Sequence, residues 1–164
     1  MRLNLREIIE IPGGFVPFEA ELDTENLYFP SVTAYNSKPR AVGQVKNEAG
    51  VLHLTGTLTA DMVCICDRCG GEFESTKELR LDATIVEEDT GVNPELFLLE
   101  GDEIDLSDIL STCFILDMET KFLCSEDCKG LCDRCGSNLN LGPCGCRKQI
   151  DPRFAVLEQL LDKE

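Results

Sequence analysis

The chain has 164 residues, of which 43% are hydrophobic and 6% aromatic, and it contains no tryptophan. This composition is enough for a modest core and excludes a chain that is disordered throughout. The formal net charge is −16, from 15 basic and 31 acidic side chains. No apolar run approaches the roughly 20 residues that a membrane-spanning helix needs.

The N-terminal segment carries charges at Arg2, Arg6, Glu7 and Glu10. It therefore lacks the apolar core of a secretory signal, and we expect a cytoplasmic protein that does not associate with a membrane. Prolines and glycines break residues 1–40 into short pieces, so no helix or strand is assigned there.

From residue 41 the pattern is typical of β-strands. A stretch rich in β-branched residues at 51–58 follows a turn at 47–50, and residues 62–66 continue as a more apolar strand. After a turn at 67–71, one face of the next strand is formed by Leu79, Leu81, Ala83 and Ile85. This alternation predicts an antiparallel β-meander, or a partly open barrel, with one solvated face.

An acidic loop at 87–94 precedes a predicted helix that is capped near Asp105. Its apolar face has helical spacing and consists of Leu106, Ile109, Leu110, Cys113 and Phe114. Cys113 is expected to be a small buried hydrophobe. A last helix is predicted to begin at Asp151 and Pro152, with an apolar face formed by Phe154, Leu157, Leu160 and Leu161.

These elements predict an α+β fold with one or two helices and two domains. Residues 1–120 form a β-rich domain with the acidic loop and the helix. Residues 121–164 form a cysteine-rich, zinc-ribbon-like module with the C-terminal helix. Most of the negative charge lies between them, because residues 72–120 hold 2 basic and 15 acidic side chains, a net of −13. The basic stripe that usually accompanies nucleic-acid binding is missing.

The chain has ten cysteines, which in a reducing compartment indicate metal binding or redox chemistry rather than disulfides. The sequence Cys-Asp-Arg-Cys-Gly occurs twice, from Cys66 to Gly70 and from Cys132 to Gly136. Two residues between the thiolates let the backbone curl under one metal ion, and the glycine supplies a positive φ. A close Cys-Gly-Cys pair completes a four-thiolate site within fifteen residues, here called the local site: Cys132, Cys135, Cys144 and Cys146.

The other clustered cysteines give a second site, which joins the meander to the C-terminal module. This long-range site consists of Cys66, Cys69, Cys124 and Cys128, and it leaves Cys64 and Cys113 over. We predict two structural zinc ions on these eight thiolates. An iron–sulfur cluster on the same thiolates is the alternative. A thioredoxin-like dithiol is disfavoured, because an antiparallel hairpin rather than a helix follows the first motif.

No catalytic set accompanies the cysteines. His53, the only histidine, lies in an alternating strand and is expected to be a half-exposed surface residue. The sequence has neither a glycine-rich phosphate loop nor a nucleophile elbow. Because four-thiolate sites are closed to substrate, we predict that the protein is not an enzyme.

Several stretches together resemble the bacterial YceD family. They are the cysteine-rich residues 123–140, residues 142–146, residues 151–157, the first Cys-Asp-Arg-Cys motif after a β region, and Ile104-Asp105-Leu106 at the start of a helix. The resemblance implies a metal-binding protein needed for the accumulation of large-subunit ribosomal RNA. Some members lack the last cysteine cluster but keep a Cys-x-x-Cys and a later Cys/His pair, which supports the grouping of the long-range site. Cys64 stands where the family usually has an apolar residue or Thr, and is excluded as a ligand.

Two functional hypotheses follow. In the first, a non-enzymatic zinc-binding factor in large-subunit ribosome biogenesis shields a basic ribosomal protein, or binds a pre-ribosomal particle. Its acidic surface would include Glu87, Glu88, Asp89, Glu100, Asp102 and Glu103. In the second, the C-terminal module contacts rRNA directly through Lys121, Lys129, Arg134, Arg147, Lys148 and Arg153.

Overall fold

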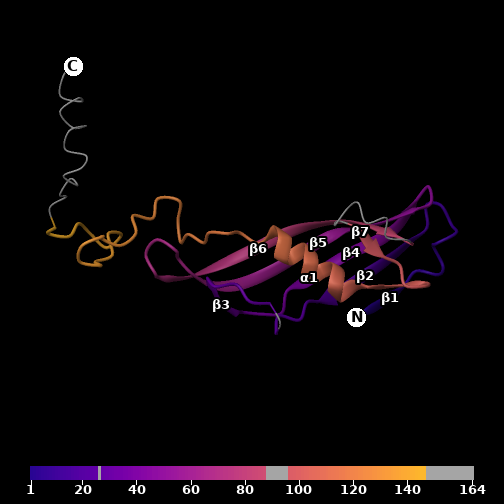
Figure 1. Ribbon diagram of the computed structural model, residues 1–164, viewed down its shortest axis with the longest axis horizontal. Coiled ribbons are helices and arrows are strands. Elements are labelled where there is room, and N and C mark those ends of the chain that lie inside the picture. The colour runs from indigo at the N-terminus through magenta and orange to yellow at the C-terminus, as the bar shows by residue number, and fades with distance from the viewer. Residues whose placement is uncertain (26, 88–95, 147–164) are drawn as a thin grey trace, which may run out of the picture.

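The computed structural model describes residues 1–25, 27–87 and 96–146 (Figure 1). The sheets and the helix lie toward one end of an elongated molecule, and the cysteine-rich segment extends toward the other (Figure 1). The larger sheet has the strand order β2-β4-β5-β6-β7, with β3 paired to the far half of β5. Its strands are β2 (Phe15–Glu21), β3 (Val32–Tyr35), β4 (Arg40–Glu48), β5 (Val51–Ile65), β6 (Glu72–Val86) and β7 (Leu96–Leu98).

The predicted meander is confirmed. Strands β4, β5 and β6 are consecutive antiparallel neighbours, and the long β5–β6 hairpin carries the first cysteine motif at its turn. Because the strand path ends at β2 on one side and at β7 on the other, the sheet is open in the part of the chain that is described. The Cys66–Gly70 motif lies at the turn of the β5–β6 hairpin and hence at the end of these two long strands.

The core lies on one face of this sheet, as the alternation predicted. The apolar residues predicted for one face of β6 are all buried, and so are Leu52, Leu54 and Leu58 of β5. Helix α1 (Leu106–Asp117) packs its apolar side into the same core. Its predicted cap is confirmed, since the Asp105 side chain accepts a hydrogen bond from Ser107 N at 3.0 Å. Cys113 is only half-buried at the margin of this core.

The N-terminal residues contain strands that the sequence did not reveal. Besides β2 and β3, the short strand β1 (Arg2–Asn4) pairs with β8 (Glu103–Asp105) in a separate sheet. Asn47 holds part of this region in place, because its buried Nδ2 donates to the carbonyls of Ile8 and Ile9 at 2.8 and 2.7 Å. The helix predicted from residue 151 lies outside the described residues, and the domain boundary at residue 120 stays a prediction. No described helix has the length and apolar character to cross a membrane.

Candidate metal centres

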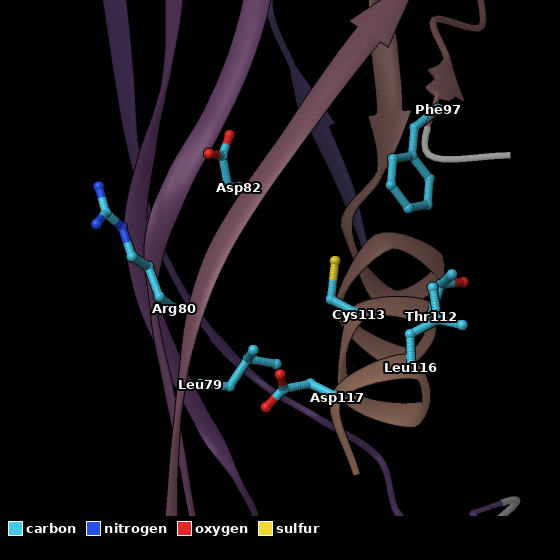
Figure 2. Close-up of a pocket in the computed structure, with 8 residues that line it drawn as sticks. All are labelled: Leu79, Arg80, Asp82, Phe97, Thr112, Cys113, Leu116 and Asp117. Carbon is cyan, nitrogen blue, oxygen red and sulfur yellow. The ribbon is translucent and has the colours of Figure 1, made fainter. Parts of the chain in front are cut away.

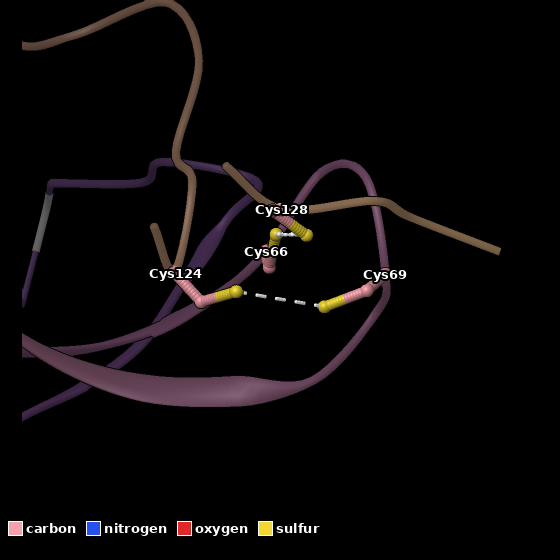
Figure 3. Close-up of side chains that lie close together, drawn as sticks. All are labelled: Cys66, Cys69, Cys124 and Cys128. Atoms are coloured by element: carbon pink, nitrogen blue, oxygen red, sulfur yellow. Dashed lines mark hydrogen bonds between the residues drawn. The ribbon is translucent and has the colours of Figure 1, made fainter. Parts of the chain in front are cut away.

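The eight cysteines predicted as ligands fall into the two predicted groups. In each group the four sulfur atoms lie within 4.8 Å of one another. Figure 3 shows the sulfurs of the long-range site converging from the β5–β6 turn and from the segment that follows α1. That these thiols bind a metal ion stays a prediction.

Both Cys-Asp-Arg-Cys-Gly motifs fold into the same turn. The N–H of Gly70 donates to the carbonyl of Cys66 at 2.8 Å, and the N–H of Gly136 donates to the carbonyl of Cys132 at 2.9 Å. The two glycines have φ values of 67° and 69°, a conformation that disfavours any side chain. The repeated sequence therefore encodes a repeated structure, which brings the two sulfurs of each motif to one side.

The sulfur spacing of the long-range site suits a single tetrahedral ion. Sγ of Cys66 lies 3.7 Å from Sγ of Cys128, and Sγ of Cys69 lies 3.7 Å from Sγ of Cys124. Four thiolates at about 2.3 Å from a tetrahedral zinc ion lie about 3.8 Å from one another. These two distances match such an ion, and the remaining sulfur–sulfur distances are at most 4.8 Å.

The two residues between the cysteines of the first motif position the second pair of thiols. The Asp67 carboxylate accepts hydrogen bonds from Ser31 Oγ and from Phe122 N, both at 2.7 Å, and these contacts lower its pKa. Asp67 N donates in turn to Phe122 O at 2.9 Å. Arg68 Nη1 donates to the carbonyl of Cys128 at 3.1 Å. Sequence reasoning treated Asp67 and Arg68 only as spacers, although their repetition beside Cys132 was a visible signal.

Asn140 connects the segment of the local site to the long-range site. Its Oδ1 accepts a hydrogen bond from Lys129 N at 2.8 Å, and its Nδ2 donates to Sγ of Cys128 at 3.3 Å. This contact lowers the pKa of the Cys128 thiol. Like Asp67 and Arg68, Asn140 therefore supports the thiols without being a ligand itself, as outer-shell residues do at metal sites.

The four thiols of the long-range site differ in how readily they ionise. Burial opposes ionisation of Cys66, but backbone N–H groups, first among them that of Cys124, lower its pKa to about 6. The pKa of Cys124 is raised to about 12, chiefly because its thiol is hydrogen-bonded to Cys128 and lies near the other sulfurs. Without a cation, one thiolate thus forms at the expense of its neighbours. A bound divalent cation would stabilise all four as thiolates.

The local site repeats this contrast in a more exposed setting. Cys132 is buried, whereas Cys135 is exposed. The Ser137 hydroxyl, 3.1 Å from Sγ of Cys135, is the main cause that lowers the pKa of this thiol to about 6. The pKa of Cys146 is raised to about 12, chiefly by its hydrogen bond to Cys135.

The two cysteines that were left over lie apart from both groups. Cys64 is fully buried in β5, and burial raises the pKa of its thiol. Cys113 lies on α1, where burial likewise raises its pKa. Neither belongs to a group of converging ligand atoms in the described residues. Cys113 is half-buried rather than buried as expected, and the exclusion of both cysteines as ligands stays a prediction.

Part of the predicted acidic surface is already paired within the chain. Glu100 Oε2 lies 2.9 Å from Arg2 Nη2, and Asp102 Oδ2 lies 3.9 Å from Arg6 Nε. Glu103 also faces Arg2, at 3.9 Å. Of the other residues predicted for the two charged surfaces, Glu87, Lys121, Lys129 and Arg134 belong to the described chain, whereas Glu88, Asp89, Arg147, Lys148 and Arg153 lie outside it.

Comparison with known proteins gives a family and distant relatives. The family model described as "Large ribosomal RNA subunit accumulation protein YceD" matches residues 54–161. Uncharacterized proteins of Mycobacterium bovis and Mycobacterium tuberculosis are each 31% identical over 120 residues, which cover 70% of this chain and 58% of the relative. The chain thus spans little more than half the length of these relatives.

A relative from Arabidopsis thaliana is named "Large ribosomal RNA subunit accumulation protein YCED homolog 1, chloroplastic". It is 36% identical over 70 residues, which cover 40% of this chain and 22% of the relative. No solved structure matches the chain significantly.

Proposed function

The chain belongs to the YceD family, and from this membership we propose that it is a non-enzymatic, zinc-stabilised factor in the accumulation of large-subunit ribosomal RNA. The observation that carries the metal part is the convergence of four sulfurs from two distant segments, with spacings of 3.7 Å. The name of the family and of its chloroplast relative supports the ribosomal part. The cytoplasmic location expected from the sequence belongs to the same proposal.

Zinc is the proposed metal because the site suits one ion with four thiolates. An iron–sulfur cluster contains several irons and would hold its cysteine sulfurs further apart than a single ion does. A four-thiolate zinc site leaves no open position for substrate, so its contribution is to folding. The ion in the long-range site would fasten the β5–β6 turn to the segment after α1, and the ion in the local site would order residues 132–146.

Charge favours a basic protein partner over free RNA. Residues 72–120 carry a net charge of −13, which attracts a basic ribosomal protein and repels the phosphate backbone. Because Glu100 and Asp102 face Arg2 and Arg6, the strongest acidic field is expected elsewhere in this segment. The exposed side of β6 carries four carboxylates, Glu72, Glu74, Glu78 and Asp82, and no ion pair joins them to another described residue.

Affinity capture from lysate, split into samples with and without nuclease, tests this function. Capture of a basic ribosomal protein that survives nuclease is the expected result. Replacing Glu87, Glu88, Asp89, Glu100, Asp102 and Glu103 by their amides should weaken its binding and flatten the salt dependence, with zinc content unchanged. Arg147→Glu with Lys148→Glu is the matched control and should leave this binding intact. Tight binding of isolated rRNA that this control abolishes would instead make the cysteine module an RNA-binding element.

A further inference from the structure

One edge of the large sheet is open along β6. Strand β7 pairs with β6 only at residues 84–86. Leu99 N donates to Val86 O at 2.8 Å, so this carbonyl points away from β5. The N–H and C=O groups of successive residues in a strand point to opposite sides. The backbone groups of the even-numbered residues therefore also point away from β5: Glu74, Thr76, Glu78, Arg80 and Asp82. No described strand pairs with this outward side between residues 74 and 82.

The opposite edge of the sheet is strand β2, which carries a proline. Asn47 N donates to Gly14 O at 2.9 Å, so the even-numbered residues of β2 point toward β4 and the odd-numbered ones point outward. Pro17 occupies one of these outward positions and has no N–H to offer to another strand. Proline is a common protection of sheet edges. β6 has no proline, and within the described ranges 1–25, 27–87 and 96–146 the protection of residues 74–82 comes from the charges of β6 itself.

A groove runs beside the open part of β6. It has a volume of about 230 Å³ and lies between β6, β7 and one side of α1. Figure 2 shows Cys113 and Leu116 on α1 and Phe97 on β7 around this space, with Leu79 of β6 facing α1 and Asp82 pointing to the other side of β6. Leu116 is 73% exposed, although it is a large apolar residue. The groove therefore offers apolar contacts next to backbone groups of β6 that pair with no strand in the part of the chain that the structure describes.

The charge of β6 selects what can occupy this edge. On the solvent face, Glu74, Glu78 and Asp82 outnumber Arg80. Side chains on paired strands lie about 4.5–5.5 Å apart, where opposite charges stabilise pairing and like charges destabilise it. A second copy of β6 would be repelled, and so would RNA phosphates. A basic strand would be attracted, with its alternate side chains directed into the apolar groove.

We propose that the edge of β6 at residues 74–82 binds an extended basic protein segment by strand addition. Lysine or arginine side chains of that segment face Glu74, Glu78 and Asp82, and its intervening apolar side chains contact Cys113, Leu116 and Phe97. The inference deepens the proposed function and rests on it for the class of partner. It adds the mode of binding, in which backbone hydrogen bonds and alternation matter in addition to charge.

A designed peptide tests strand addition with the full-length, metal-loaded protein. The probe is a nine-residue peptide in which lysine alternates with valine, and the control peptide has the same residues in one lysine block and one valine block. The alternating peptide should bind at least about tenfold more tightly, because only it can place charge and apolar groups on opposite faces. Its binding should slow hydrogen exchange at the outward amides of Glu74, Thr76, Glu78 and Arg80. Equal affinity of the two peptides, or unchanged exchange at these amides, would overturn strand addition.

Proline substitution supplies a second test. Glu78→Pro removes an outward N–H without removing a bond to β5 and should weaken binding of the alternating peptide at least about tenfold. Glu78→Gln keeps the N–H and should weaken it less. Glu19→Pro, at an outward position of β2, is the matched control and should leave binding unchanged. Circular dichroism and metal content verify folding of each variant, and the exchange measurement on the wild type stands if Glu78→Pro does not fold. Unchanged binding by a folded Glu78→Pro variant contradicts the inference.

The two proposals fail in distinguishable ways. If a captured ribosomal protein binds the Glu78→Pro variant as tightly as the wild type, strand addition fails while the proposed function holds. If the alternating peptide binds and requires the Glu78 N–H, but lysate yields no ribosomal protein, the open edge is a binding site and the proposed function fails.

Discussion

Asn140 donates a hydrogen bond from its Nδ2 to Sγ of Cys128 at 3.3 Å, and so joins the two cysteine clusters. Asn140 lies between the two cysteine pairs of the local site, whereas Cys128 belongs to the long-range site. A loop that one ion would order thus supports a ligand of the other ion. We expect the two sites to bind metal with positive coupling, because order in the local site holds Asn140 in position.

The first prediction concerns this contact. Asn140→Ala should lower zinc affinity at the long-range site about tenfold, the lower end of the range for outer-shell residues. Asn140→Asp keeps the acceptor for Lys129 N but places a carboxylate beside the sulfur, and should lower the affinity further. Competition with a chromophoric chelator measures both effects. Equal affinity of the alanine variant and the wild type would show that the contact does not support the site.

The second prediction concerns metal content and stability. The wild type should carry two zinc ions, and Cys66→Ser and Cys132→Ser should each lose one. Cys66→Ser should lower the melting temperature of the sheet more than Cys132→Ser does, because it frees the segment after α1 from the β5–β6 turn. The three other ligands that would bind the same ion as Cys132 all lie within fifteen residues, outside the sheet. Cys113→Ser is the control and should keep both ions. Elemental analysis and thermal denaturation measure these outcomes, and iron in place of zinc would contradict the proposed metal.

The third prediction is that zinc affinity rises with pH. The pKa values of Cys124 and Cys146 are raised to about 12, so both thiols are protonated at neutral pH before metal binds. Each site must then release at least one proton on binding, and affinity should increase at least about tenfold per pH unit from pH 7 to 9. Acidification acts in the opposite direction and removes the metal. Calorimetry in two buffers of different ionisation enthalpy counts the protons, and a count of zero would contradict the expected thiol state.

The fourth prediction concerns Asn47, which is 1% exposed. Asn47→Ala would leave the carbonyls of Ile8 and Ile9 and the N–H of Gly50 without their side-chain partner. The free energy of unfolding should fall by about 2–3 kcal/mol, the cost of leaving buried polar groups unpaired. Asn36→Ala, at an exposed site, should change it by less than about 0.5 kcal/mol. Urea denaturation compares the two.

The sequence predicted strands best where the alternation of apolar and polar residues was not interrupted by proline. The meander was predictable because Leu79, Leu81 and Ala83 alternate with charged residues over a long strand. Strand β2 has a similar alternation at Phe18 and Ala20, but Pro17 interrupts it, and proline lowers the expectation of a strand. The tertiary contacts that make β2 an edge strand are not visible in its residues.

The two groups of cysteines could be predicted for a different reason, namely their spacing in the sequence. The ligands of the local site lie so close in the chain that spacing alone suggests their grouping, and the long-range group followed by pairing what remained. The roles of Asp67, Arg68 and Asn140 depend on where the segment after α1 passes the hairpin turn, which spacing does not encode. The pairing of Arg2 with Glu100 likewise arises because β1 meets β8 across about a hundred residues.

The entropic cost of loop closure predicts that the local site can form before the chain folds, whereas the long-range site forms after it. The local site lies within fifteen residues, so a metal ion can close it on a chain that is otherwise unfolded. Cys66 and Cys128 are 62 residues apart, and the entropic cost of closing a loop grows with its length. The sheet and α1 meet that cost before the four thiols of the long-range site come together. If the sites bind metal as proposed, an ion that reaches the unfolded chain would find only the local site competent, and occupancy of the long-range site would require a chain that has completed its fold.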